Sequence, residues 1–150
     1  MILEKVTANK KLIAEDLILI WEDAVRKTNS FLKEENIAKF RPLAKLAIKN
    51  MQTLLIAKEK NNTIMGFVAI ENKKIEMLFV KPEFLGIGVG KALLLFAIKN
   101  YNAMWVDVSE QNIKALEFYK RMGFTVFCCS KANNTANSFT IFHMKWEEEK

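Results

Sequence analysis

The sequence is poor in the residues that form cross-links and metal centres. It has two cysteines in 150 residues, and they are adjacent, Cys128 and Cys129. Neighbouring cysteines cannot form an ordinary framework disulfide and do not provide metal-ligand spacing. The one histidine, His143, lies in a strand-like run and is expected to pack or to face solvent. We therefore predict no metal site, and two reduced cysteines on alternate faces of a strand.

Long apolar segments are also missing. No stretch approaches the eighteen uninterrupted apolar residues of a membrane span, and the first residues, MILEKVTANKK, contain no apolar run of signal-peptide length. We expect a cytoplasmic protein with no membrane partner. With 150 residues and 51% hydrophobic content, the chain suits one compact α/β domain over residues 1–150.

Glycine is scarce, but three of the five glycines occupy every second position of one loop: Gly86, Gly88 and Gly90. An apolar strand pattern at 75–80 precedes this loop, and a strongly apolar helix pattern follows it at once. Glycine lets the backbone approach a ligand, and the first N–H groups of a helix lack internal partners. Strand, loop and helix together predict an anion site, with phosphate as the natural occupant.

Two common phosphate motifs do not fit this loop. A P-loop has four residues between its first glycine and Gly-Lys-Ser/Thr, whereas here only three separate Gly86 from Gly90. The hydroxyl residue is also missing, because Lys91 is followed by Ala92. A Rossmann fingerprint reads Gly-x-Gly-x-x-Gly after the first strand. Here the loop reads Gly-x-Gly-x-Gly after several strand-like runs, although Asp107 lies where a ribose-binding acid would be expected.

Two segments resemble signatures of the GNAT superfamily of N-acetyltransferases, in particular of its small bacterial members. Val80-Lys81-Pro82 followed by GIGVGK at 86–91 is similar to the family's acetyl-CoA motif. The segment NIKALEFYKRMGF at 112–124 is similar to the second signature, Asn-x-x-Ala-x-x-Phe-Tyr-x-x-x-Gly-Phe. The resemblance covers about residues 56–144. It implies an enzyme that moves an acetyl group from acetyl-CoA (coenzyme A) to a primary amine by direct attack in a ternary complex.

The resemblance also implies the GNAT fold, of α/β (α+β) class. This fold is a single mixed, mostly antiparallel sheet of about six to seven strands with a central splayed parallel pair, flanked by about four helices. We expect Pro42 to divide the second helix or to begin its second half. Residues 131–138 should form the polar loop of a closing hairpin. The patterns predict strands at 2–6, 53–58, 64–70, 75–80, 104–108, 125–130 and 139–146. They also predict a helix with Asn9 as its N-cap that runs to about 27, and helices at 34–50, just after Gly90, and at 113–122.

The resemblance places the pantetheine arm against the strand that ends at Val80 and the pyrophosphate on the glycine loop. Leu85 occupies a position where the family usually has Arg or Gln, but backbone N–H groups hold most of the pyrophosphate. Asn112 matches a residue that contacts the cofactor arm, although it also suits the N-cap of the next helix. The residues expected to bind the cofactor are Leu78, Phe79, Val80, Leu85, Gly86, Ile87, Gly88, Val89, Gly90, Lys91, Asn112, Phe118 and Tyr119.

Two residues are candidates for catalytic proton transfer. Tyr119 matches the family's usual general acid, and the alternative is that it only packs in an aromatic cluster. Glu76 matches a position where several members carry a catalytic base, and water is the alternative. Glu76 should lie on the face opposite Met77 if the strand alternates regularly. The resemblance implies that a backbone N–H near Phe79 or Val80 meets the oxyanion.

The acceptor side is expected at the end of the first helix. Thr28, Asn29 and Phe31 fall in a segment similar to the Thr-His-x-Phe-Leu segment of small bacterial members, with Asn29 in place of His. These three residues are the candidates for substrate binding. The sequence does not name the acceptor, which is a small-molecule or peptide amine.

The charge pattern gives little support to a nucleic-acid partner. The net charge of +6 comes from scattered lysines rather than from a dense basic run, and the phosphates of CoA account for it, with Lys81 and Lys91 as candidate contacts. We expect no nucleic-acid partner, and a homodimer is left open. Two other functions stay open: a GNAT-fold sensor or partner module that binds CoA without turnover, and acylation of aminoacyl-tRNA.

Overall fold

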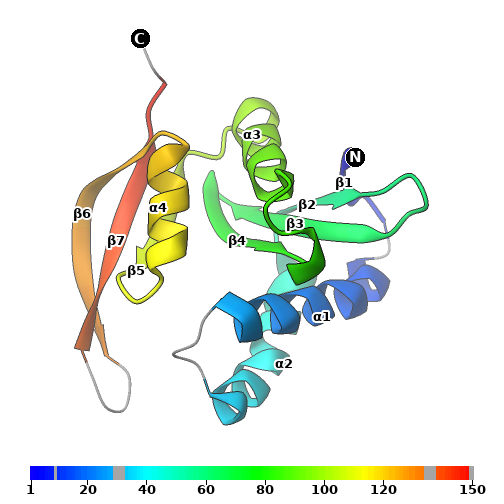
Figure 1. Ribbon diagram of the computed structural model, residues 1–150, viewed down its shortest axis with the longest axis horizontal. Coiled ribbons are helices and arrows are strands. Elements are labelled where there is room, and N and C mark those ends of the chain that lie inside the picture. Colours follow the sequence, from blue (N-terminus) through cyan, green and yellow to red (C-terminus); the bar gives the residue numbers. More distant parts are fainter. Residues whose placement is uncertain (9, 29–32, 134–137, 149–150) are drawn as a thin grey trace.

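The computed structural model describes residues 1–8, 10–28, 33–133 and 138–148. Within these ranges the chain forms seven strands and four α-helices (Figure 1). The strands are β1 (Ile2–Lys5), β2 (Thr53–Lys58), β3 (Ile64–Glu71), β4 (Lys74–Val80), β5 (Trp105–Ser109), β6 (Phe124–Asn133) and β7 (Ser138–Trp146). The helices are α1 (Lys10–Thr28), α2 (Glu34–Asn50), α3 (Val89–Tyr101) and α4 (Ile113–Arg121), with a 3-10 turn, η1 (Pro82–Phe84), before the glycine loop.

All seven strands belong to one mixed sheet in the order β1-β2-β3-β4-β5-β7-β6. Every neighbouring pair is antiparallel except β4 and β5, which are parallel because the chain crosses over through α3 between them. The predicted fold class, a mostly antiparallel sheet with one central parallel pair and four helices, is confirmed.

The parallel pair is very short. Only Lys74 with Trp105 and Ile75 with Val106 are paired, and the remaining residues of the two strands diverge. Beyond this point residues 76–80 of β4 have no partner on β5, and the edge that they turn toward β5 faces a gap in the sheet, which we call the β4–β5 opening (Figure 1). The predicted splay therefore lies directly before the glycine loop.

The helices cover the sheet unequally, and two hydrophobic cores result. The first core lies under α3 and α4 and includes Leu93, Val106 and Tyr119. The second lies under α1 and α2 and includes Leu17 and Phe67. Each fully buried side chain of this size contributes about 1.5–3 kcal/mol to stability. Among the described residues the second core contains none from β5, β6 or β7. No described helix covers the face of these strands turned away from α4, and we call it the open face.

Pro42 does not divide the second helix, contrary to the prediction. Helix α2 runs without a break from Glu34 to Asn50, with Pro42 inside it. The proline removes one backbone donor, which leaves the carbonyl of Ala38 without its helical partner, and Ala38 is exposed to water that can replace it. Ile37 on one side and Ile48 on the other are buried, so packing holds both halves in one line.

The closing hairpin is longer than predicted. Strand β6 continues to Asn133 and β7 begins at Ser138, so half of the expected loop at 131–138 is strand, and residues 134–137 lie outside the described part. Lys131 and Thr140 are cross-strand partners joined by a side-chain hydrogen bond of 2.8 Å, which supports pairing in this polar stretch. Cys128 and Cys129 are free and exposed on β6 and pair with consecutive residues of β7, as expected for alternate faces.

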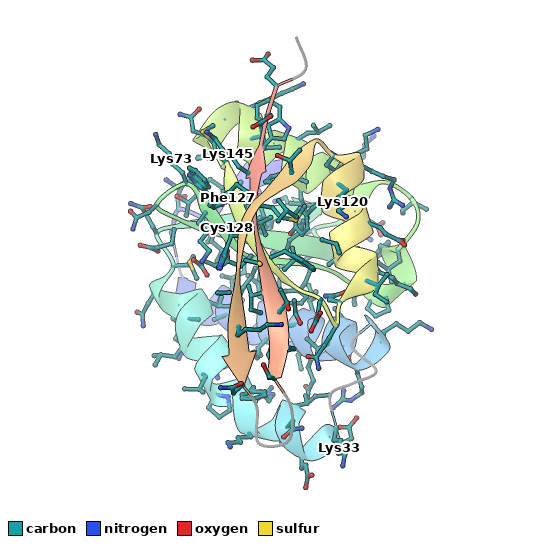
Figure 2. The ribbon with its side chains drawn as sticks, turned by 90° about the vertical axis from the view of Figure 1, so that its left-hand side faces the viewer. Lys33, Lys73, Lys120, Phe127, Cys128 and Lys145 are labelled. Carbon is teal, nitrogen blue, oxygen red and sulfur yellow. The ribbon has the colours of Figure 1, made fainter. Side chains whose placement is uncertain are left out.

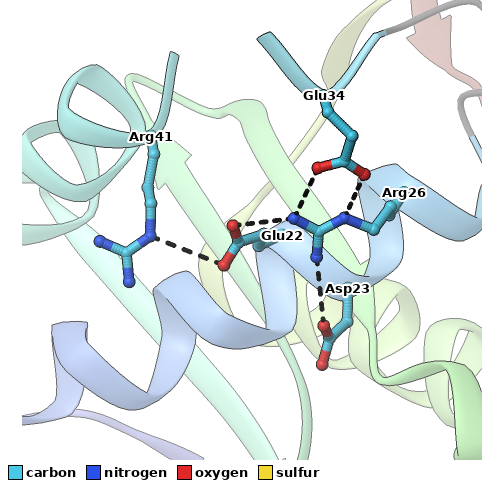
Figure 3. Close-up of polar contacts among 5 residues, drawn as sticks. All are labelled: Glu22, Asp23, Arg26, Glu34 and Arg41. Carbon is cyan, nitrogen blue, oxygen red and sulfur yellow. Dashed lines mark hydrogen bonds and ion pairs between the residues drawn. The ribbon is translucent and has the colours of Figure 1, made fainter. Parts of the chain in front are cut away.

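Ion pairs join the end of α1 to the start of α2 (Figure 3). The Arg26 guanidinium donates two hydrogen bonds to Glu34, of 2.6 and 3.0 Å, and one of 3.1 Å to Glu22. Asp23 lies 3.9 Å from the same group, and Arg41 on α2 lies 3.6 Å from Glu22. This network fixes the two helix ends that flank residues 29–32, where the acceptor side was predicted.

Candidate functional site

The glycine loop has the backbone shape that an anion site needs. Gly86 and Gly88 have φ values of +81° and +90°, a left-handed region that side chains rarely adopt. A Cβ at either position would have no neighbour within 4 Å, so the space next to both glycines is open. Gly88 caps α3 without a side-chain hydrogen bond, which leaves the first N–H groups of that helix for a ligand.

Gly90 differs from the other two glycines of the motif. It lies inside the first turn of α3 and its φ is not positive. A Cβ there would be 3.6 Å from Val80 Cγ2 and 3.8 Å from Phe118 Cζ, which is ordinary contact. Gly90 therefore marks where α3 comes close to both β4 and α4. The small residue brings the predicted cofactor residues of these three elements together.

The last residues of β4 face two directions. Leu78 and Val80 are half-buried against the first core, whereas Phe79 packs on the second core, where its ring lies 5.9 Å from that of Phe67. Beyond Ile75, β4 is bonded to β3 alone, so every second N–H and C=O of this stretch is directed to the β4–β5 opening. These groups can pair with an extended amide chain.

Helix α4 brings two aromatic side chains to the first core next to this opening. Tyr119 is buried, with its ring 5.2 Å from that of Phe118 and 5.4 Å from that of Phe124. Burial raises the pKa of the Tyr119 phenol above its ordinary value near 10. The phenol therefore stays protonated throughout the physiological range, as a proton donor must.

Asn112 caps α4. Its side-chain oxygen accepts a hydrogen bond of 3.2 Å from the N–H of Ala115. The N-cap role that the sequence left open is thus observed. The second lone pair of the amide oxygen and the amide N–H groups are still available to a ligand.

Glu76 lies at the start of the opening, but the strand does not alternate regularly there. Ile75 pairs with Ile70 and Met77 pairs with Ala69, so Glu76 is an extra residue in a β-bulge. Its expected orientation, on the face opposite Met77, was conditional on regular alternation, and the bulge removes that condition. The Glu76 carboxylate lies 3.8 Å from Lys74 Nζ and is half-exposed.

Lys74 links Glu76 to the next strand. Its Nζ lies 2.6 Å from Asp107 Oδ2, and this hydrogen bond is the main cause that raises the pKa of Lys74. Asp107 also accepts a bond from His143 on β7. Our sequence reasoning considered Asp107 only as a ribose ligand and missed this cluster. The alternation of polar and apolar residues at 105–109 and 142–144 indicated that Asp107 and His143 lie on one face of their strands. It gives no strand register, so it could not show that the two residues pair.

Side chains around the glycine loop are mostly exposed. Leu85 and Ile87 are 45% and 64% exposed, and Val89 alone of this group is buried. Lys91 is exposed and has no ion pair within the described residues. Lys81 lies 3.5 Å from Glu83, so part of its charge is already compensated.

The residues predicted to bind the acceptor, Asn29, Phe31 and the side chain of Thr28, lie outside the described residues.

A shallow hollow of about 390 Å³ lies between α1 and the turn that joins β2 to β3, and it does not include the glycine loop. It is lined by Asp16, Leu19, Ile20, Asp23, Asn62, Ile64 and Lys81.

None of the helices in the described part of the chain is both long and apolar enough to cross a membrane. The same residues contain no group of three or more His, Cys, Asp or Glu side chains arranged to hold a metal ion.

Comparison with known proteins agrees with this geometry. The family described as acetyltransferase (GNAT) domain matches residues 22–148. The chain is 29% identical to peptidyl-lysine N-acetyltransferase YjaB of Salmonella typhimurium, over 87% of this chain and 89% of the relative. It is 26% identical to YjaB of Escherichia coli, over 88% and 89%.

Solved structures show the same fold. The solution structure of apo-form YjaB from Escherichia coli has a TM-score of 0.82 and 25% identity, covering 97% of this chain and 98% of that one. PaiA N-acetyltransferase from Thermoplasma acidophilum, in complex with coenzyme A, has a TM-score of 0.70 and 24% identity, over 97% and 100%. Since the family matches most of the chain, including both signatures and the parallel pair between them, the chain belongs to the GNAT family of acetyl-CoA-dependent N-acetyltransferases.

Proposed function

We propose that the acceptor is the side-chain amine of a lysine in a peptide or protein, and that it attacks acetyl-CoA directly in a ternary complex. One observation carries this proposal: the glycine loop, the β4–β5 opening and Tyr119 adjoin one another at the point where the sheet separates. The relatives named peptidyl-lysine N-acetyltransferases support a lysine acceptor. The hollow beside α1 is lined by two carboxylates, Asp16 and Asp23, and one lysine, Lys81. Asp23 already lies 3.9 Å from Arg26, so Asp16 is the carboxylate that favours a cationic partner there.

In this proposal the chain binds the cofactor mostly through its backbone. The N–H groups after Gly86 and Gly88 hold the pyrophosphate, with Lys91 as the nearby free cation. Residues 78–80 pair with the pantetheine arm, and Phe118 and Asn112 border it on the α4 side. Acetyl-CoA supplies the thioester that is attacked.

Proton transfers are assigned to two side chains. Glu76, directly or through water, takes a proton from the acceptor ammonium, which must first replace the Glu76 contact with Lys74. A backbone N–H near Phe79 or Val80 stabilises the charge on the carbonyl oxygen. Tyr119 gives its proton to the leaving sulfur and recovers one from solvent. The nitrogen of the new amide loses its second proton to water, and Glu76 releases the first one to solvent.

The test combines cofactor binding with turnover. Acetyl-CoA should raise the melting temperature by mass action, and a lysine peptide should be acetylated with release of free thiol. Gly88→Asp should lose both effects, because it adds a side chain and a negative charge where phosphate binds. Asn100→Asp, which adds the same charge at the exposed far end of α3, is the matched control and should keep both. A Gly88→Asp protein stabilised like wild type would contradict the loop assignment.

The same assays separate the alternatives. Thermal stabilisation without turnover on peptides, polyamines, amino acids or free amines would favour a CoA-binding module, for which Leu85 in place of Arg is the main support. Turnover on small amines alone would exclude the peptide acceptor. A salt-dependent association with tRNA would favour acylation of aminoacyl-tRNA.

The proposal also includes the wider setting of the enzyme. We propose that the chain works in the cytoplasm as one GNAT domain over residues 1–150. A homodimer remains a hypothesis, and light scattering at several protein concentrations is its direct test.

A further inference from the structure

A serine, a histidine and an aspartate lie on three neighbouring strands of the open face, and Lys74 joins the aspartate to Glu76. Ser130 Oγ on β6 lies 2.8 Å from His143 Nε2 on β7. His143 Nδ1 lies 2.6 Å from Asp107 Oδ1 on β5. A nucleophile within hydrogen-bond reach of a base, with the base oriented by a third group, is the arrangement that activates a serine.

The protonation pattern follows from the partners of Asp107. Burial raises the pKa of this carboxyl, but hydrogen bonds from Lys74 and His143 outweigh burial and hold the pKa below its usual value. The ionised carboxylate only accepts hydrogen bonds, so His143 Nδ1 must carry a proton. In a neutral imidazole Nε2 then has a free lone pair, which accepts the Ser130 O–H.

The direction of the histidine separates this site from acetyl transfer. The strand order places β5 next to the opening, then β7, then β6. Nε2 faces Ser130 on the last strand and is therefore directed away from the opening, and β5 and β7 lie between Ser130 and the opening. The Nε2 atom of His143 is therefore not directed to an amine that attacks a thioester in the β4–β5 opening.

The surroundings suit a small aromatic or apolar group. The Phe127 ring lies 5.3 Å from that of Trp105 in an edge contact and 6.3 Å from that of His143, and Phe127 is 55% exposed. Figure 2 shows Phe127 and Cys128 on the side of the hairpin turned away from α4. Since β6 is the last strand of the sheet in the described residues, every second N–H along its outer edge has no ladder partner there.

We propose that Ser130 is an acyl-accepting nucleophile for small aryl esters, at a site separate from the acetyl-CoA site. Ser130 Oγ attacks the acyl carbon while its proton passes to His143 Nε2. The bond from that carbon to the ester oxygen breaks, and the leaving alcohol takes the proton from His143. Water, activated in turn by His143, releases the carboxylic acid and restores Ser130.

A fluorophosphonate probe on the full chain tests the nucleophile, with peptide mass spectrometry to locate the label. Ser130 should be labelled at least about tenfold faster than Ser138, an exposed serine on β7 that serves as an internal control. His143→Gln, which keeps an amide donor for Asp107, should slow labelling by about 10²-fold or more, as for loss of a general base. Equal rates at the two serines, or a His143→Gln rate equal to wild type, would overturn the proposal.

Two variants separate this site from the acetyl-CoA site. Folded Gly88→Asp should label Ser130 at the wild-type rate, and Ser130→Ala should keep acetyl transfer. Loss of labelling in folded Gly88→Asp would show that the two sites are one and would refute the proposal. Hydrolysis of p-nitrophenyl acetate, measured with both Cys128 and Cys129 changed to Ser to remove reactive thiols, should disappear in Ser130→Ala, and unchanged hydrolysis would likewise refute it.

Discussion

Tyr119 is buried between two phenylalanine rings, so its hydroxyl can be removed without altering the packing of the ring. Tyr119→Phe keeps the ring and its packing, and we expect acetyl-CoA affinity and the fold to be preserved. If the phenol protonates the leaving sulfur, kcat should fall by about 10²- to 10⁴-fold. Steady-state kinetics with a peptide acceptor measures this effect. A near-normal kcat would remove Tyr119 from the mechanism and leave water as the acid.

The same burial predicts a dependence of stability on pH. The pKa of the Tyr119 phenol is raised in the folded chain, so the folded chain holds this proton more tightly than the unfolded chain does. This contribution is complete below the unfolded pKa, about 10, and is lost as pH rises above it. Wild type should therefore lose stability relative to Tyr119→Phe above about pH 10. Thermal melts of both proteins across this range check the prediction, and parallel curves would contradict it.

A substitution at Leu85 is expected to strengthen cofactor binding. It is 45% exposed at the end of η1, so a longer side chain fits there without disturbing a core. Leu85→Arg should tighten CoA binding modestly, because it adds a cation near the expected pyrophosphate. Titration calorimetry of wild type and variant measures the change. Weaker binding in a folded variant would mean that the loop departs from family geometry.

At the scale of the element, the glycines of the loop should not be equivalent. Gly88 has a left-handed φ, so Gly88→Ala should cost about 1–2 kcal/mol of stability from backbone strain. Gly90 is helical and has room for a Cβ, so Gly90→Ala should leave the free energy of unfolding nearly unchanged or raise it slightly. Urea denaturation of the pair compares them directly. A larger loss for Gly90→Ala would reverse the assigned roles.

Most elements could be predicted from the sequence, because apolar period and turn residues mark them locally. The strands of the first half and the crossover helix after the loop agree closely with expectation. Pro42 was misjudged because burial of Ile37 and Ile48 overrides a local breaker. The bulge at Glu76 and the register that joins Asp107 to His143 depend on pairing between strands far apart in sequence, for which local patterns carry no information.

At the scale of the whole molecule, the sheet consists of two parts that are joined by few backbone hydrogen bonds. Strands β1 to β4 form one part, with both of its faces covered by helices, and β5, β7 and β6 form the other, covered on one face. Two residue pairs, Lys74 with Trp105 and Ile75 with Val106, are the ladder between them. The N–H groups of Met104 and Trp105 also donate hydrogen bonds to the Lys73 carbonyl, of 2.7 and 3.2 Å. Side-chain packing in the first core and the Lys74–Asp107 ion pair add to this connection.

Hydrogen exchange should detect this weak junction. Without ligand, backbone amides of residues 76–80 that face the opening should exchange quickly, while their neighbours bonded to β3 exchange slowly. Acetyl-CoA should protect the fast set, because an extended arm would take the place of a strand partner. Unchanged exchange at saturating acetyl-CoA would contradict pairing of the arm with β4.

A junction of two residue pairs also has a mechanical consequence. Pulled apart across β4 and β5, the two parts should separate at a low force before either unfolds, since few hydrogen bonds resist the load. Bound acetyl-CoA would contact both parts and raise the force needed to separate them, so the substrate would stabilise the enzyme that consumes it against mechanical load.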